Sequence, residues 1–229
     1  MGRSLLKICG IMSEETLKII GEENLPIDWL GFIFAYGKRK LTPAQWEIMS
    51  QFVPMTVKTA GVFVNPDLKE VAEVFQKAPL HLVQLHGQES PEFCSQVKDE
   101  FGCKVIKVIG VGEDGQAHLE LESYQGKVDY LLLDTMTKAQ AGGTGKVFAW
   151  DRIPAFQQRC ERIGIPLLVA GGLNEDNIEA LIQQYHPFGI DLSSSLETNG
   201  MKDMGKIRNV IDVVERMALH DGNRNEQQV

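Results

Sequence analysis

The sequence has 229 residues, of which 43% are hydrophobic and 24% charged, a composition that fits a globular protein and excludes a disordered or fibrous chain. Its formal net charge of −8 at pH 7 argues against a general nucleic-acid-binding surface, although it leaves room for a local basic pocket that binds a small anion. The apolar runs are too short for a signal peptide or a membrane span. Together with the negative charge, this predicts that neither membranes nor nucleic acids are partners.

The cysteine pattern indicates the redox compartment. Cys9, Cys94, Cys103 and Cys160 form no CxxC pair and have no metal-ligand spacing with the five histidines. We therefore expect four separate thiols and a cytoplasmic protein.

Runs rich in β-branched and aromatic residues alternate with segments of helical periodicity along the chain. Eight strands are predicted, at residues 5–9, 29–34, 58–64, 81–86, 104–109, 129–134, 166–170 and 188–193. Capping residues predict helix starts at Ser13, Thr42, Asn65, Ser90 and Asn174. A last helix is expected over residues 202–219, with one apolar stripe of Ile207, Val210, Ile211, Val214 and Met217.

This alternation predicts a parallel sheet, and eight such units predict closure into a (β/α)8 TIM barrel with outer helices. An open doubly wound sheet is the alternative, but it would usually have a glycine-rich turn after its first strand, where "KICGIMSEE" has a single glycine. We expect one domain over residues 1–220. The polar residues 221–229 are expected to form a flexible tail.

The active site of a barrel lies at the carboxyl ends of its strands, and polar residues gather there. They are Cys9, Arg39, Asn65, Gln84, His86, Asp134 and Asp191. Each has an ordinary structural explanation on its own, but their recurrence at equivalent positions favours a site. The glycines at 171–172 and the serines at 193–195 end the last two strands, where backbone amides can bind a phosphate group.

The motifs at these strand ends resemble those of the phosphoribosylanthranilate isomerase family of tryptophan biosynthesis. In chain order they are "KICGI", "GFIFAYGKRK", "GVFVN", "VQLHGQE", "LLLDT" followed by "GGTGKVFAW", "PLLVAGGLNEDNI" and "GIDLSSSLE". The resemblance runs from about Lys7 to Lys206. It implies an Amadori rearrangement of N-(5-phosphoribosyl)anthranilate to 1-(2-carboxyphenylamino)-1-deoxyribulose 5-phosphate, without a cofactor or metal.

By this resemblance Cys9 matches the general base and Asp134 the general acid. Arg39 matches the arginine that binds the anthranilate carboxylate, a task that Lys40 could share. The phosphate would be bound by Gly171, Gly172, Ser193, Ser194 and Ser195, and the remaining substrate contacts are expected from Gln84, His86 and Asp191. The partner is then a phosphorylated small molecule, and either a monomer or a homodimer is compatible with the sequence.

Three positions differ from the residues that are usual in the family. Ser195 replaces a glycine in the phosphate loop, so that one contact to the phosphate is adjusted or is made by a hydroxyl. Ala149 and Asn199 stand where aspartate and proline are common, and neither touches the proposed chemistry.

The chemistry needs one acid and one base. Asp134 follows three leucines, where desolvation would favour the protonated acid, whereas the thiolate of Cys9 has to be stabilised. Alternation along the first strand places Lys7 on the same face as Cys9, so its ammonium group could stabilise the thiolate. The alternative is that Lys7 pairs with a carboxylate inside the barrel, such as Asp191.

Three other functions would be compatible with a phosphate-binding barrel. A ribulose-phosphate epimerase would need metal-binding His and Asp residues at several strand ends, where only His86 is so placed. The related isomerase of histidine biosynthesis would need an aspartate at the position of Cys9. A barrel that only binds a sugar phosphate would need neither Cys9 nor Asp134.

Overall fold

The computed structural model describes residues 3–112, 120–137, 140–141 and 150–226, and of residues 136–137, 140–141 and 220–226 only the backbone. Of the motif "GGTGKVFAW", only Trp150 lies within this part of the chain, so Ala149 lies outside it. Residues 227–229 of the predicted tail also lie outside it. Within the described residues, no helix is long and apolar enough to cross a membrane.

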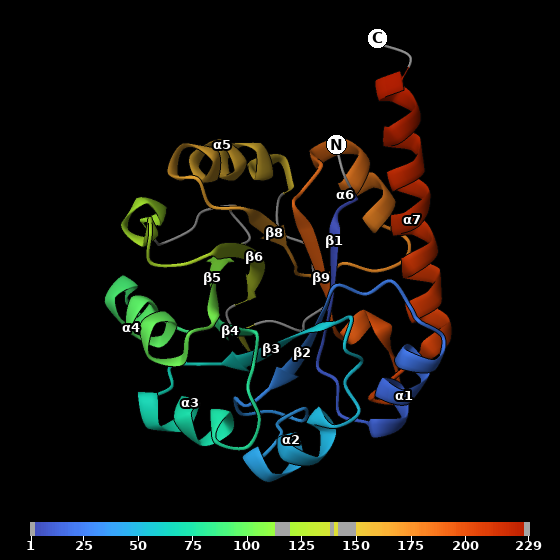
Figure 1. Cartoon of the computed structure of the whole chain (residues 1–229). Helices are drawn as coiled ribbons and strands as arrows, with labels where there is room; N and C mark the ends of the chain where they lie inside the picture. The colour runs from blue at the N-terminus through green and yellow to red at the C-terminus, as the bar shows by residue number, and fades with distance from the viewer. Residues whose placement is uncertain (1–2, 113–119, 138–139, 142–149, 227–229) are drawn as a thin grey trace.

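Eight parallel strands close into a barrel, which confirms the predicted (β/α)8 architecture (Figure 1). They are β1 (Leu5–Cys9), β2 (Trp29–Ile33), β3 (Lys58–Phe63), β4 (Leu82–Leu85), β5 (Lys104–Val111), β6 (Tyr130–Thr137), β8 (Leu167–Val169) and β9 (Gly189–Leu192). Each strand pairs with its neighbours along the chain, β9 pairs with β1, and β5 pairs with β6, so the sheet has no free edge among these strands. All eight lie where the sequence predicts them.

Helices surround the sheet. They are α1 (Glu14–Glu22), α2 (Pro43–Ser50), α3 (Leu68–Phe75), α4 (Pro91–Phe101), α5 (Ile153–Ile163), α6 (Ile178–Tyr185) and α7 (Met204–Glu226), together with the short 3-10 helices η1 (Leu121–Tyr124), η2 (Trp150–Arg152) and η3 (Ser194–Leu196). Between β5 and β6, the only helix among the described residues is the 3-10 helix η1.

The capping signals are right for three helices and displaced for two. Ser13, Thr42 and Ser90 cap α1, α2 and α4 through their side chains. The start predicted at Asn65 is wrong: Asp67 caps α3, because its side chain and that of Glu70 form a reciprocal capping box. The start predicted at Asn174 is also displaced, and α6 begins after Asn177.

Helix α5 has no predicted counterpart, although Pro154 in its first turn is a typical start signal. In α7 the predicted apolar stripe is buried, with exposures from 0% at Ile207 to 6% at Ile211. This helix continues to Glu226, past the end expected at Leu219.

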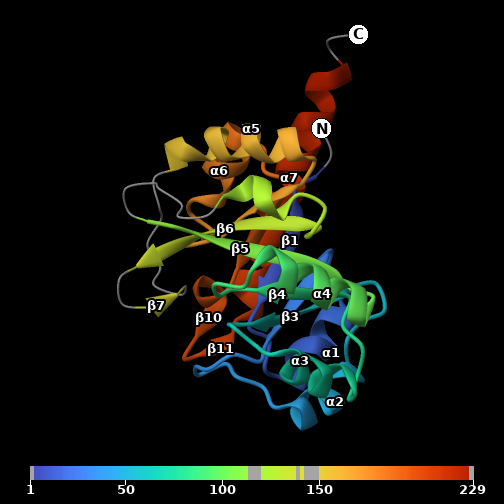
Figure 2. The same cartoon turned by 90° about the vertical axis from the view of Figure 1, so that its left-hand side faces the viewer.

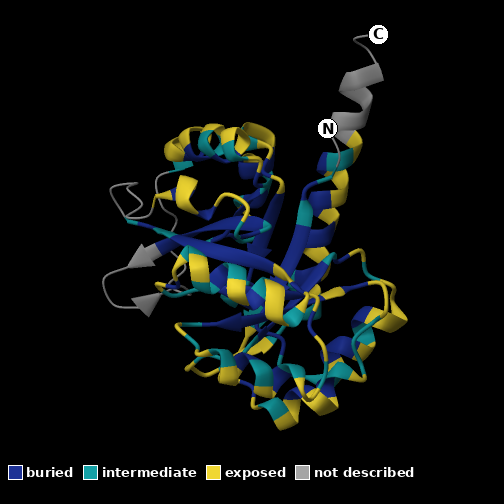
Figure 3. Cartoon of the chain, turned by 60° about the vertical axis from the view of Figure 1, so that its left-hand side comes forward, coloured by how far each residue is buried: buried dark blue, intermediate teal, exposed yellow. Residues whose placement is uncertain are grey.

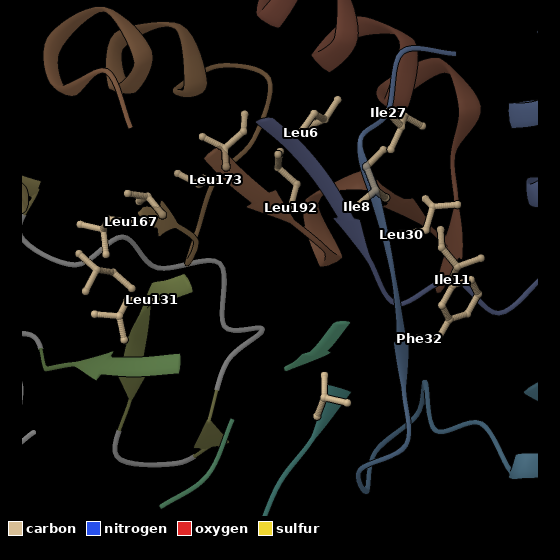
Figure 4. Close-up of a cluster of buried hydrophobic side chains, with 14 of the residues drawn as sticks. Leu6, Ile8, Ile11, Ile27, Leu30, Phe32, Leu131, Leu167, Leu173 and Leu192 are labelled. Carbon is tan, nitrogen blue, oxygen red and sulfur yellow. The ribbon is translucent and has the colours of Figure 1, made fainter. Parts of the chain in front are cut away.

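Two apolar layers result from the alternation of side chains along the strands. One layer lies inside the barrel, and in it Trp29 and Tyr130 meet edge to face with ring centroids 4.9 Å apart. The other lies between the sheet and the helices and includes Leu6, Ile8 and Leu192 (Figure 4). Figure 3 shows the same division, with buried strands inside helices whose outer faces are exposed.

Three short strands lie at the end of the barrel toward which β6 points (Figure 2). They are β7 (Gln140–Ala141), which pairs antiparallel with the end of β6, and the hairpin β10 (Glu197–Thr198) and β11 (Met201–Lys202). The predicted site residues lie at this end, because it carries the carboxyl ends of the barrel strands.

Candidate active site

One cavity of about 490 Å³ at the carboxyl ends of the strands is lined by most of the predicted site residues, but not by Asn65. Its polar lining comprises Cys9, Arg39, Gln84, His86, Asp134, Asp191 and the residues 171–172 and 193–195. Ile33, Val62, Val64 and Leu173 give it an apolar part. Lys40, the alternative to Arg39, is exposed and is not part of this lining.

Cys9 is the last residue of β1, and its side chain occupies space that β2 leaves open. A Cβ atom on Gly31, the register partner of Cys9, would lie 2.7 Å from Cys9 Sγ, which is closer than such atoms approach. The thiol is 6% exposed. Burial raises the pKa of Cys9, the charge of Lys7 opposes this, Asp191 adds to it, and Lys202 again lowers it; the net direction is upward. In the ligand-free protein Cys9 is therefore a protonated thiol at neutral pH.

Lys7 lies one step deeper in the barrel on the same face of β1, and it is fully buried. Its Nζ donates to Asp191 Oδ2 at 2.7 Å. Burial alone would lower the pKa of Lys7, but the attraction of Asp191 and of Cys9 outweighs burial, so its pKa is raised and the ammonium form is retained. Lys7 thus pairs with Asp191, and its charge also lowers the pKa of Cys9, but not enough to offset burial and keep the thiolate ionised.

This arrangement predicts the ionisation of Cys9. Since its pKa is raised, the thiolate fraction in the ligand-free protein is small at pH 7 and grows with pH, so the ultraviolet absorbance of the thiolate should appear mainly above neutral pH. Lys7→Met should move the ultraviolet titration of the thiolate to still higher pH. The double variant Lys7→Met/Asp191→Asn serves as the control for the unpaired carboxylate. An unchanged titration in both variants would exclude an effect of Lys7 on the sulfur.

Asp134 lies in β6 and is 8% exposed. Its Oδ1 accepts a hydrogen bond from the backbone N–H of Thr135 at 2.7 Å, and its Oδ2 lies 3.3 Å from His86 Nε2. Gly171 has φ +84°, and a Cβ atom there would lie 2.8 Å from Asp134 Oδ1. The loop after β8 can therefore approach this carboxyl group only with a glycine at that position.

A buried ion pair between Lys107 and Glu89 holds the loop that carries His86. Lys107 Nζ donates to Glu89 Oε2 at 2.8 Å and to the backbone oxygen of Gly87 at 2.7 Å. Glu89 in turn accepts the N–H groups of Asn65 and Gly87. These contacts join the loops after β3 and β4, and they hold His86 beside Asp134.

The two loops that are predicted to bind phosphate both line the cavity. Gly171 and Gly172 both have positive φ, at +84° and +68°. Ser193 Oγ donates to the backbone oxygen of Cys9 at 3.1 Å, which ties the last loop to the end of β1. Three side-chain atoms of the cavity lining are buried without a hydrogen-bond partner among the described residues: Gln84 Oε1, Asp191 Oδ1 and Ser195 Oγ.

Arg39 lines the cavity and is paired with Glu197, a residue to which the sequence analysis gave no role. Its Nε donates to Glu197 Oε1 at 2.7 Å and its Nη2 to Glu197 Oε2 at 2.9 Å. Glu197 ends the quoted motif "SSSLE", so the motif was the signal that could have identified it. Within the described part of the chain, no group of three His, Cys, Asp or Glu residues could hold a metal ion.

Comparisons with known proteins bear on the same cavity. A family profile described as N-(5'phosphoribosyl)anthranilate (PRA) isomerase matches residues 6–213. The chain is 42% identical over 218 residues to the N-(5'-phosphoribosyl)anthranilate isomerase of Brevibacillus brevis, covering 95% of this chain and 96% of the relative.

Solved structures agree with these sequence matches. The phosphoribosyl anthranilate isomerase of Thermotoga maritima superposes with a TM-score of 0.78 at 32% identity, covering 93% of this chain and 98% of that one. A phosphoribosyl anthranilate isomerase in complex with reduced 1-(o-carboxyphenylamino)-1-deoxyribulose 5-phosphate has a TM-score of 0.75 at 30% identity, with the same coverage. The chain belongs to the N-(5'-phosphoribosyl)anthranilate isomerase family.

Proposed function

We propose that Asp134 and Cys9 are the acid and the base of the reaction that this chain catalyses, the isomerisation of N-(5'-phosphoribosyl)anthranilate in tryptophan biosynthesis. The observation that carries the proposal is their position. Both side chains line one cavity, at the carboxyl ends of strands on different parts of the barrel, and the glycine and serine loops line it with them. One sugar phosphate can then contact all three at once.

The rearrangement consists of one proton transfer from the acid and one to the base, followed by tautomerisation of the resulting enol, in which its hydroxyl loses a proton and the anomeric carbon gains one. Asp134 gives a proton to the ring oxygen of the ribose while the bond from that oxygen to the anomeric carbon breaks, which leaves a protonated imine. Cys9, as the thiolate, then removes the proton from the neighbouring carbon. The electrons of that C–H bond form a double bond to the anomeric carbon and neutralise the imine, and the resulting enol becomes the ketone of the product.

The raised pKa of Cys9 has a place in this sequence of steps. Burial keeps the thiol protonated in the free protein, and the protonated imine adds a positive charge to those of Lys7 and Lys202, which already favour the thiolate; the thiol proton then passes to solvent at the mouth of the cavity. Ring opening by Asp134 therefore favours the base that performs the next step. The order of events is acid first and base second.

The remaining cavity residues are assigned to binding. Arg39 pairs with the anthranilate carboxylate, because a guanidinium group binds a carboxylate through two parallel hydrogen bonds. The loops of Gly171, Gly172 and residues 193–195 bind the phosphate. Gln84 and Asp191 each present an unpartnered buried oxygen, as seen among the described residues, and these oxygens would accept hydrogen bonds from the ribose hydroxyls. His86 contacts the substrate from beside Asp134.

Two further proposals concern the whole chain. Residues 1–220 act as one domain, which is supported by a single closed sheet to which segments from Leu5 to Leu192 contribute. A cytoplasmic location is supported by four free, buried cysteines.

The function is tested by turnover with purified protein and no added metal or cofactor. The substrate is fluorescent, so its consumption can be followed directly, and we expect it to disappear with formation of the ribulose product. Ribulose 5-phosphate and the substrate of the histidine-pathway isomerase serve as comparison substrates. Turnover of either one at a higher kcat/KM than phosphoribosylanthranilate would contradict the proposed specificity.

A further inference from the structure

The guanidinium group of Arg39 is held by a carboxylate outside the catalytic pair. Glu197 accepts two hydrogen bonds from Arg39 and a third from Lys202 Nζ, at 2.8 Å. The Glu197 side chain is only 10% exposed. Burial raises the pKa of Glu197, but the hydrogen bonds from Arg39 and Lys202 outweigh burial and lower it, so the carboxylate is ionised at neutral pH.

The chain places Glu197 there through a short hairpin. In β10 and β11, Glu197 and Lys202 are direct register partners, so their side chains meet on one face. Lys202 Nζ also donates to the backbone oxygen of Ser193 at 3.0 Å, and Lys206 Nζ donates to the backbone oxygen of Glu197 at 2.7 Å. Glu197 is therefore tied to the loop that follows β9 and not to a free surface.

Arg39 is fixed along its length as well as at its end. A Cβ atom on Gly10 would lie 2.7 Å from Arg39 Cδ, so the aliphatic part of Arg39 packs directly over the residue that follows Cys9. The pair with Glu197 uses Nε and Nη2, and no described residue accepts a hydrogen bond from Nη1. An arginine has donors on two edges of its planar group, so a second carboxylate can bind the other edge.

The charges of this cluster favour an anion. Arg39 and Lys202 carry two positive charges against one negative charge on Glu197, so the cluster is still positive when the pair is formed. A second carboxylate at Arg39 would therefore be attracted and not repelled. The side chain that lines the cavity is Arg39, while Glu197 is not part of the lining.

We propose that Glu197 is a positioning residue for substrate recognition: it holds one edge of the Arg39 guanidinium so that the other edge binds the anthranilate carboxylate. This inference rests on the proposed role of Arg39. It assigns to Glu197 a share in the preference for a substrate with an ortho carboxylate, and none in the proton transfers.

The test compares two unreactive ligands in a double-mutant cycle. One is the reduced carboxyphenylamino-deoxyribulose phosphate, and the other is the same molecule without its carboxyl group. The Kd of the ligand without the carboxyl group, divided by the Kd of the ligand with it, measures recognition of the carboxylate alone. In Glu197→Gln this ratio should fall about 10-fold, which is the effect of losing one well-placed charged hydrogen bond. In Arg39→Met it should fall at least as far, and in the double variant it should fall no further than in Arg39→Met.

The controls separate placement from folding. Glu122→Gln removes a carboxylate from a comparable bidentate pair with Arg159, away from the cavity, and should leave the ratio unchanged. Affinity for ribose 5-phosphate should be retained in each variant that folds. If Glu197→Gln does not bind ribose 5-phosphate, Glu197→Asp replaces it, and the same fall is expected because the shorter side chain cannot hold Arg39 in place.

Three results would overturn the inference. If Arg39→Met lowers the ratio and the Glu197 variant leaves it unchanged, or if the two effects add in the double variant, Glu197 does not act through Arg39. If Arg39→Met itself keeps the wild-type ratio, the proposed role of Arg39 is wrong, and the role of Glu197 falls with it.

Discussion

Cys9→Ala is expected to lower kcat by about 10²- to 10⁴-fold, which is the usual contribution of a positioned acid or base. The loss should appear in kcat and not in affinity, because the proposal gives the thiol a role in proton transfer and assigns binding to Arg39 and the loops of residues 171–172 and 193–195. Steady-state kinetics give the first quantity, and the Kd of the unreactive product analogue gives the second.

The control for Cys9 is another buried cysteine. Cys160 lies in α5, is 2% exposed and belongs to the layer between helices and sheet. Cys160→Ala makes the same cysteine-to-alanine change in this apolar layer, and it should leave kcat unchanged. Near-normal turnover of Cys9→Ala would show that another group takes the proton, and Asp191 and His86 would be the next candidates.

Asp134→Asn should produce a loss of similar size, about 10²- to 10⁴-fold in kcat. The amide oxygen can still accept the hydrogen bond that Thr135 donates to Oδ1, so the position of the side chain is kept while the transferable proton is lost. The measurement is again kcat together with the Kd of the product analogue, which should change little.

Asp129, which directly precedes β6, offers a matched control for Asp134. It accepts hydrogen bonds from Lys98 Nζ at 3.0 Å and from the backbone N–H of Val105 at 2.9 Å, and it is not part of the cavity lining. Asp129→Asn should lower the free energy of unfolding without a comparable loss of kcat. Full turnover by Asp134→Asn would move the role of acid to another group.

Much of the fold was predictable because its signals are local. Each strand is a short apolar run, and the alternation of its side chains also determines which residue ends up at the mouth of the barrel. That is why Cys9, Gln84, Asp134 and Asp191 could be assigned to one site from their positions in eight similar units. The closed sheet then brings these strand ends together.

Other features depend on contacts between segments far apart in the chain, and the sequence leaves them open. The pairing of Arg39 with Glu197 joins residues 158 positions apart and depends on the register of a two-residue hairpin. The pairing of Lys7 with Asp191 spans 184 positions and was one of two alternatives. The direction of the Cys9 pKa follows from burial, which a motif does not show.

The helix starts predicted at Asn65 and Asn174 were wrong for a different reason. Near Asn65 and Asn174, several residues compete to cap the next helix, and the choice depends on the loop geometry. Asn65 itself adopts φ +47° and donates its backbone N–H to Glu89, so it serves the loop after β3 and not the helix.

The central claim is that Asp134 opens the ring and Cys9 then removes a proton from the neighbouring carbon. The most direct test is the kinetic isotope effect on kcat with substrate deuterated at that carbon, measured in Asp134→Asn and in Cys9→Ser. The effect should be near unity in Asp134→Asn, because ring opening becomes the slow step, and clearly larger in Cys9→Ser, because proton removal does. Equal isotope effects in the two variants would contradict the assignment of these two residues to separate steps.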